Sequence, residues 1–128
     1  MLLAILAKIL IVLGAVALAA LVLKVLFLTL RSVLQKVRDR LRVSVGRKCF
    51  VGAVSRLARE VTLEAERNGN IHSVDEMLAE LGEEGVVIAD MDANGHVDRD
   101  KIEIISSREI DEKLENLLDQ NQGEIVFA

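Results

Sequence analysis

The sequence has no proline, tryptophan or tyrosine, and its three phenylalanines are Phe27, Phe50 and Phe127. Proteins that bind single-stranded nucleic acid usually stack the bases on exposed aromatic rings, so this scarcity argues against such a partner. Cysteine occurs once, at Cys49, which excludes an internal disulfide bond. We expect Cys49 to be a semi-buried structural thiol rather than a site of lipid attachment.

Residues suited to catalysis are equally scarce. The two histidines, His72 and His96, precede a helix start and lie in a loop, where we expect both to be exposed. The sequence contains no glycine-rich phosphate loop and no paired His or Cys ligands for zinc. We therefore expect no catalytic residues and no enzymatic activity.

The sequence does contain a long apolar run. Residues 2–30 are almost wholly apolar and are interrupted only by Lys8 and Lys24. A helix needs about 20 apolar residues to cross a bilayer. The two lysines would lie about 24 Å apart along such a helix and could extend their ammonium groups toward the two surfaces. Residues 1–30 are thus predicted to form one transmembrane helix centred near Val16.

Two alternatives compete with a membrane anchor. A cleaved signal peptide is disfavoured because no charge precedes the apolar run and the run is too long. The other alternative is an apolar helix buried in a self-assembled bundle. Ala15 and Ala19 form a small-xxx-small pair that would permit close helix packing, although this spacing arises easily by chance in an alanine-rich run.

Charge is strongly segregated along the chain. Residues 31–59 contain nine basic residues and one acidic residue, Asp39, whereas residues 60–128 contain five basic and nineteen acidic residues. Basic residues next to a membrane helix are retained on the cytoplasmic side. The sequence therefore predicts a single-pass membrane protein with a cytoplasmic C-terminal domain.

The connector at 31–48 carries an apolar stripe at helical spacing, from Leu30 to Leu41. Seven basic residues accompany it: Arg31, Lys36, Arg38, Arg40, Arg42, Arg47 and Lys48. They could form a lipid-facing basic patch that binds anionic lipid, or they could serve only as a topology signal and solvated stem. We favour the second interpretation. Binding to a nucleic-acid backbone is disfavoured, since the attached domain is acidic.

The remainder, 49–128, has the pattern of a small acidic α/β domain. We expect a helix over 49–67 and a second helix that starts at the Ser73–Glu76 capping box. The later elements are strands at 86–89 and 101–105, a helix with an apolar stripe from Ile110 to Leu118, and a strand at 124–127. A further short strand is possible at 41–46. The expected fold class is α+β, an α-α-β-β-α-β domain with a three-stranded sheet.

One motif carries recognisable chemistry, the segment DMDANGHVD at 90–98. Asp90, Asp92, Asn94 and Asp98 occupy positions 1, 3, 5 and 9 of a calcium-loop pattern, with Gly95 at position 6 and His96 at position 7. This segment resembles an EF-hand loop, and it is also similar to the strand-flanked loops of the FG-GAP repeats of integrin-type propellers. The resemblance covers nine residues and implies a Ca²⁺ site.

The segment departs from both patterns. Position 12 of an EF-hand should be a bidentate glutamate and is Lys101 here, and the flanking segments look like strands. FG-GAP loops occur in repeats, whereas this chain has one copy. The alternative is a polar hairpin with Asn94 and Gly95 at its tip. A weak calcium site would be filled outside the cell, opposite to the side that the basic flank indicates.

Three functions follow from the sequence as expectations. The first is a membrane-anchored, non-enzymatic interaction or structural module, a subunit or adaptor of a larger assembly with an unknown protein partner and a possible homo-oligomer. The second is a calcium-stabilised domain displayed outside the cell. The third is a pore-forming or holin-like protein, for which Lys8 and Lys24 would be the pore-lining charges.

Overall fold

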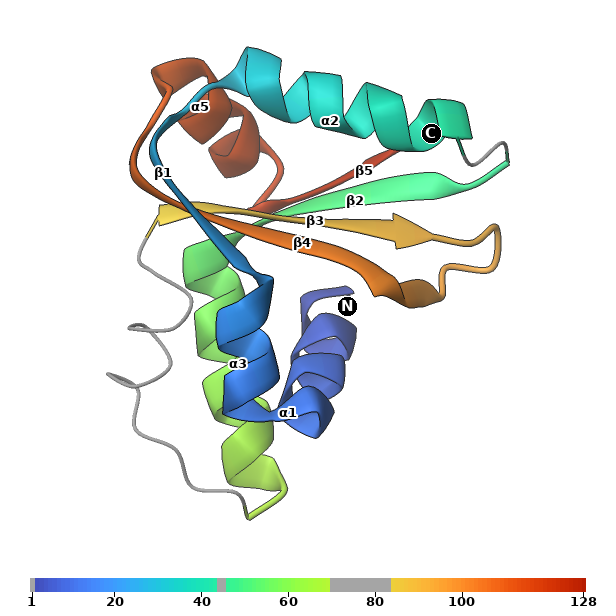
Figure 1. The fold of residues 1–128 in the computed structure, drawn as a ribbon, viewed down its shortest axis with the longest axis vertical. Helices are drawn as coiled ribbons and strands as arrows, with labels where there is room; N and C mark the ends of the chain where they lie inside the picture. The colour runs from blue at the N-terminus through green and yellow to red at the C-terminus, as the bar shows by residue number, and fades with distance from the viewer. Residues whose placement is uncertain (1, 44–45, 70–83) are drawn as a thin grey trace.

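The structure is a computed structural model that describes residues 2–43, 46–69 and 84–128, and in helix α1 the side chains of residues 2–13. Its centre is a five-stranded mixed sheet in the order β1-β4-β3-β2-β5 (Figure 1). The strands are β1 (Val22–Leu28), β2 (Lys48–Ala53), β3 (Glu84–Met91), β4 (Val97–Ile110) and β5 (Glu124–Phe127). Among these described strands, β1 and β4 pair in parallel, and the other neighbours are antiparallel.

Helices cover both faces of this sheet. The described helices are α1 (Leu2–Leu21), α2 (Leu30–Val43), α3 (Val54–Arg67) and α5 (Glu112–Gln120). Helices α1 and α3 pack side by side on one face, whereas α2 and α5 cover the other (Figure 1). Because both faces are covered, the central strands are mostly apolar on both sides, as in β3, where every residue from Gly85 to Met91 is buried and Asp90 is the one charged residue among them.

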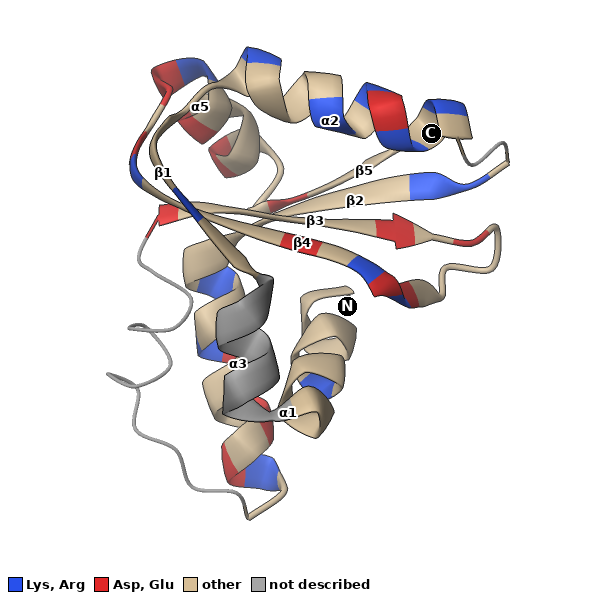
Figure 2. Ribbon diagram, in the orientation of Figure 1, with Lys and Arg blue, Asp and Glu red and all other residues tan. Residues whose placement is uncertain are grey.

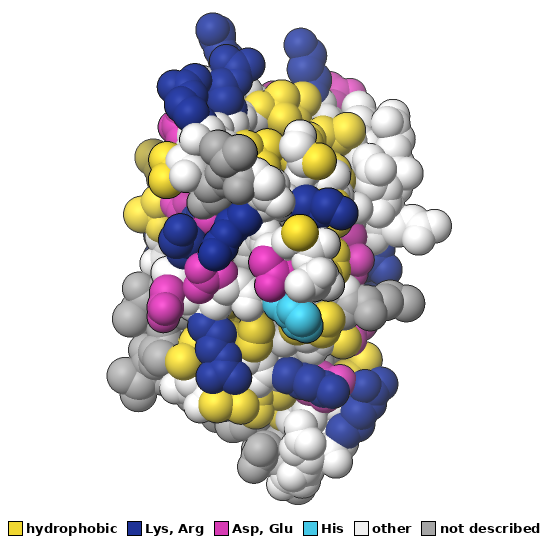
Figure 3. Space-filling model, turned by 90° about the vertical axis from the view of Figure 1, so that its right-hand side faces the viewer, with side chains coloured by type: hydrophobic (Ala, Val, Ile, Leu, Met, Phe, Trp, Pro, Cys, Tyr) yellow, Lys and Arg dark blue, Asp and Glu magenta, His cyan; other side chains and the backbone are white. Residues whose placement is uncertain are grey.

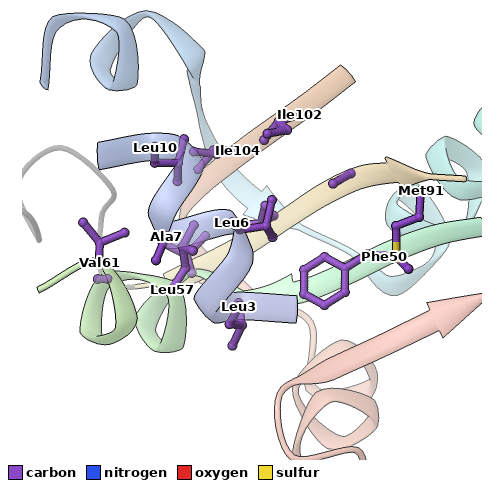
Figure 4. Packing of buried hydrophobic residues seen from close by; sticks show 14 residues of the cluster. Leu3, Leu6, Ala7, Leu10, Phe50, Leu57, Val61, Met91, Ile102 and Ile104 are labelled. Carbon is purple, nitrogen blue, oxygen red and sulfur yellow. The ribbon is translucent and has the colours of Figure 1, made fainter. Parts of the chain in front are cut away.

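The core on the α1 and α3 face draws heavily on the N-terminal segment. Four side chains of α1 are almost completely buried between α3 and the sheet, namely those of Leu3, Leu6, Ala7 and Leu10 (Figure 4). They belong to the same core cluster as Leu57 of α3. Full burial of each leucine contributes about 1.5–3 kcal/mol relative to exposure. These side chains at helical spacing therefore join α1 to the interior of the domain.

This packing overturns the prediction of a membrane anchor. The apolar run is divided between a helix and a strand, since residues 22–28 pair with β4. Within the described ranges, no helix combines the length and the apolar character that crossing a membrane requires. The predicted transmembrane helix and single-pass membrane localisation are therefore wrong. The apolarity of the run reflects burial within the protein at several of its positions.

The predicted three-stranded sheet is also wrong, because β1 and β2 were missed. The predicted helix over 49–67 begins only at Val54, and its first residues form strand β2. The apolar spacing that suggested a longer helix is shared by Phe50, Val54, Leu57 and Val61, which all lie in one core cluster. A strand that leads into a helix on the same sheet face thus imitates one long amphipathic helix.

The predicted bounds of the other helices and strands were partly confirmed. The possible strand at 41–46 is wrong, since helix α2 continues to Val43. The predicted helix end at Asn68-Gly69 is confirmed, because Asn68 caps α3 and Gly69 has a φ of 73°. The last strand, 124–127, is confirmed as β5, and the helix before it starts at Glu112. The helix predicted from Ser73 lies outside the described residues.

Candidate binding groove along helix α2

Helix α2 carries most of the basic residues that the sequence singled out (Figure 2). Val33 and Val37 are buried against the sheet and fix the orientation of the helix. The helical period then places the intervening basic side chains on two different flanks. One flank faces acidic residues of β3 and β4, and the other faces solvent beside α5 and β5.

The first flank forms a compact ion-pair cluster. Arg40 donates from Nη1 to Asp90 Oδ1 at 2.8 Å and to the Lys101 carbonyl oxygen at 2.7 Å, and from Nη2 to Glu103 Oε1 at 3.3 Å. Lys36 Nζ donates to Glu103 Oε2 at 3.0 Å. The Asp90 side chain is only 5% exposed, so the ion pair between Arg40 of α2 and Asp90 of β3 is nearly buried and attaches the helix to the sheet.

The electrostatics of the cluster follow from this geometry. Burial alone would lower the pKa of Arg40, but the hydrogen bonds and charges of Asp90 and Glu103 raise it above its ordinary value. Burial alone would raise the pKa of Glu103, but Lys36 and Arg40 lower it. Each charged group in the cluster has an opposite partner, so we assign the cluster a structural role.

The second flank of α2 borders a continuous groove. One hollow of about 440 Å³ is lined by Leu30, Arg31, Leu34, Gln35, Arg38, Asp111 and Lys113. A second hollow of about 490 Å³ is lined by Leu34, Val37, Arg38, Leu41, Arg42 and Phe127. Leu34 and Arg38 belong to both hollows, so the two join along α2. From Arg31 to Arg42 the groove is about 17 Å long.

Basic side chains line the rim of the groove, and apolar side chains form its floor. Arg31, Arg38, Arg42 and Lys113 are exposed, and none of them forms an ion pair with another described residue. Leu34 is 40% exposed. Such a combination suits an extended ligand that offers carboxylates to the rim and apolar groups to the floor.

Asp111 shapes one end of the groove by capping two helices at once. Its Oδ2 accepts the N–H of Leu30 at 3.2 Å, and its Oδ1 accepts the N–H of Lys113 at 3.2 Å. The backbone N–H of Asp111 also donates to the carbonyl oxygen of Leu28 at 2.8 Å. One carboxylate therefore joins the starts of α2 and α5 and neutralises part of the positive potential there.

The seven residues of the predicted lipid-facing patch differ in exposure and in ion pairing. Arg31, Arg38, Arg42 and Lys48 are exposed, whereas Lys36 and Arg40 belong to the ion-pair cluster. Arg47 Nη1 pairs with Asp98 Oδ2 at 3.2 Å. Basic side chains also gather at the top of the molecule over α2 when it is viewed from the hairpin end (Figure 3). Lipid binding by these residues stays a prediction.

The 90–98 segment forms a hairpin between β3 and β4. Asp92 Oδ1 accepts the N–H groups of Asn94 and His96, each at 2.9 Å, and these hydrogen bonds, that of His96 first, lower the pKa of Asp92. The backbone N–H of Asp100 and then Arg47 lower the pKa of Asp98. The predicted turn at Asn94-Gly95 is confirmed.

The predicted calcium ligands are thus engaged in contacts of their own. The Asp90 carboxylate is held by Arg40, and the Asp98 carboxylate is held by Arg47. Among the described residues, no three side chains of His, Cys, Asp or Glu gather in a way that could hold a metal ion. Calcium binding by Asp90, Asp92, Asn94, His96 and Asp98 stays a prediction of the sequence.

Cys49 lies on β2 beneath the ion-pair cluster and is completely buried, whereas the sequence led us to expect a semi-buried thiol. Burial raises its pKa to about 11, and the positive charge of Arg40 opposes this shift. At pH 8 only about one thiol in a thousand would be ionised even if reagents reached it. We expect the native protein to resist Ellman's reagent at pH 8 and to react fully once unfolded in guanidinium. Rapid labelling of the native protein would contradict the burial of Cys49.

Sequence reasoning missed three contributors to the groove, which are Asp111, Lys113 and Phe127. A signal for Asp111 was available, since aspartate directly before an apolar-periodic segment is a common helix N-cap. Phe127 lies 93 residues from Leu34 along the chain, so only the fold brings it beside α2.

Comparison of the chain with protein-family models, with curated proteins and with solved structures finds no match.

Proposed function

We propose that this chain is a non-enzymatic protein-binding module whose groove along α2 takes an extended acidic segment of a partner protein. The observation that carries the proposal is the set of exposed cations, Arg31, Arg38, Arg42 and Lys113, around an apolar floor. An extended chain rises about 3.3 Å per residue, so about five residues fill a groove of this length. Alternating carboxylates and apolar side chains would match the rim and the floor.

The lining of the groove supports binding rather than catalysis. Among the described residues that line it, none is His, Cys or Ser, and the one carboxylate, Asp111, already accepts two backbone N–H groups. A nucleophile and a general base within reach of each other are the minimum for covalent catalysis. Elsewhere among the described residues, Cys49 is buried and His96 is exposed on a hairpin.

The expected affinity is modest. An exposed ion pair contributes up to about 1 kcal/mol and weakens with salt, whereas a buried leucine adds about 1.5–3 kcal/mol. We therefore expect binding in the micromolar range that falls as ionic strength rises. A tight, salt-independent complex would indicate a different mode of recognition.

A labelled five-residue peptide with alternating glutamate and leucine tests the proposal. We expect fluorescence anisotropy to show saturable binding that the Arg38→Glu, Arg42→Glu double variant weakens at least about ten-fold, which corresponds to about 1.4 kcal/mol. Both side chains are exposed, so the fold should survive. Lys48→Glu is the matched control for the single variants Arg38→Glu and Arg42→Glu, because it makes the same charge change as each of them on an exposed residue that does not line the groove.

Two results would overturn the proposal. One is equal binding of the peptide by the wild type and by the double variant. The other is an absence of peptide binding together with binding to vesicles that contain anionic lipid, lost in the double variant. The second result would assign the exposed arginines to a lipid surface instead of a protein segment.

A further inference from the structure

Strand β1 lies at the free edge of the sheet and is apolar along most of its length. Its sequence is VLKVLFL, and β4 is its only strand neighbour among the described residues. Leu23 is 48% exposed, Leu26 is 76% exposed and Phe27 is 53% exposed. An edge of this kind presents unpaired N–H and C=O groups beside apolar side chains, and it is a template for another strand. Lys24 is its single charge.

The two faces of β1 can be assigned from its core contacts. Val22 packs with the α1 and α3 cluster, whereas Val25 packs with the α2 and α5 cluster. Because strand side chains alternate, Leu23 and Phe27 share the face of Val25, and Leu26 shares the other face with Lys24. Leu28, which packs with the α2 and α5 cluster, departs from this alternation where β1 ends. Both faces of the edge thus expose apolar side chains.

We propose that two copies of this chain pair antiparallel through β1, with Val25 on the two-fold axis. Residues directly opposite each other in an antiparallel pair point to the same face. In this register Leu23 faces Phe27 of the partner subunit, and the symmetric pair repeats on the other side of the axis. The exposed apolar side chains of one face are then joined in one cluster, and the two sheets become continuous.

The position of Lys24 selects this register. With the axis at Lys24, the two Lys24 ammonium groups would face each other, and Phe27 would lie opposite a residue of helix α1. With the axis at Leu26, Leu23 would lie opposite Thr29 of the partner subunit, beyond the end of its strand. With the axis at Val25, Lys24 faces Leu26 of the partner subunit, and its aliphatic stem can pack there. No like charges then face each other across the strand pair.

A second copy is the partner that this edge matches best, because about one axis its exposed apolar residues Leu23 and Phe27 face each other and its only charge, Lys24, faces no other charge. A pair of seven-residue strands buries less than the roughly 800 Å² per partner of a standard interface. We therefore expect a dimer that dissociates in the micromolar range. One end of the groove, at Leu30 and Arg31, follows β1 closely in the chain, but no residue of β1 lines the groove. Variants within β1 and variants of the groove lining can therefore test dimerisation and peptide binding separately.

Sedimentation equilibrium with two complementary variants tests the register. We expect wild type to dimerise, and Leu23→Glu and Phe27→Lys each to be monomeric. Each substitution removes both Leu23–Phe27 contacts of the symmetric dimer and places two charges in the apolar cluster that joins the copies. An equimolar mixture of the two variants should dimerise again. In the mixed dimer the introduced carboxylate faces the introduced ammonium, and the other pair remains Leu23 opposite Phe27.

Val126→Glu is the matched control, because Val126 is 45% exposed on the other edge strand, β5. It should leave the dimer unchanged. A disulfide test covers the case in which a charged variant fails to fold. Under oxidation, Val25→Cys should cross-link two copies, whereas Lys24→Cys should not, because only Val25 lies opposite itself. A monomeric wild type, loss of the dimer in Val126→Glu, or cross-linking through Lys24→Cys but not Val25→Cys would overturn the proposal.

Discussion

Gly85→Ala is expected to destabilise the protein by about 3–5 kcal/mol, a large share of the 5–15 kcal/mol that usually separates folded and unfolded states. Gly85 is buried near the start of β3 with a φ of 117°, a conformation that L-residues rarely adopt. A Cβ atom on Gly85 would overlap the carbonyl oxygen of Ile105 in the adjacent strand β4. The strain of positive φ and this backbone overlap act together, and neither strand can move without breaking the ladder.

Gly95→Ala provides the comparison for this prediction. Gly95 also has a positive φ, 85°, but a Cβ atom there would meet no atom within 4 Å. Only the backbone strain remains, so we expect a loss of about 1 kcal/mol. Urea unfolding followed by circular dichroism measures both variants. Equal losses in the two variants would show that the close approach of β4 to Gly85 is not what requires glycine.

The parts of the fold that follow local rules were predicted correctly from sequence. The helix end at Asn68-Gly69, the turn at Asn94-Gly95 and the final strand each depend on a few adjacent residues. The stripe from Leu30 to Leu41 likewise indicated an amphipathic helix, which the structure has as α2. Such signals are local because turn and cap geometry involve neighbouring residues only.

The N-terminal third could not be predicted in the same way. An apolar helix inserted in lipid and one packed against α3 require the same residue types, and hydropathy alone does not distinguish them. Strand β1 is recognisable only through its pairing with β4, which is about eighty residues away in the sequence. Val22 and Val25, which pack on opposite faces of the sheet, were instead counted toward one continuous helix.

The candidate groove shows the same limit. Its basic residues were noticed in the sequence, but the sequence could not separate Arg38 and Arg42, which are free on the rim, from Arg40, which is held by Asp90. This division arises from the position of β3 beneath one flank of α2. Phe127 and Lys113 enter the groove only because β5 and α5 fold back beside that helix.

Arg40→Leu is expected to lower the free energy of unfolding by about 3 kcal/mol at pH 7, the lower end of the range for breaking a buried ion pair. The Asp90 carboxylate, 5% exposed, would lose its ion-pair partner. The lower end applies because Arg40 is 20% exposed and a hollow of about 410 Å³ borders the pair, through which some water can reach Asp90. Adding Asp90→Asn to this variant should recover about half of the loss, since a buried amide costs less than a buried charge.

The pH dependence distinguishes this charge effect from lost packing. In wild type the pKa of Glu103 lies below its ordinary value of 4.5, so the stabilisation from this group is complete above that value and is lost as the pH falls through the folded pKa. In Arg40→Leu a buried carboxylate has lost its ion-pair partner, so the loss of stability should be largest at neutral pH, where carboxylates are charged, and should shrink as the pH falls toward 4. Chemical unfolding at pH 4–7 should therefore show the two curves converge in acid. A constant difference across that range would mean that Arg40 stabilises the domain through the packing of its side chain and not through the charge of Asp90.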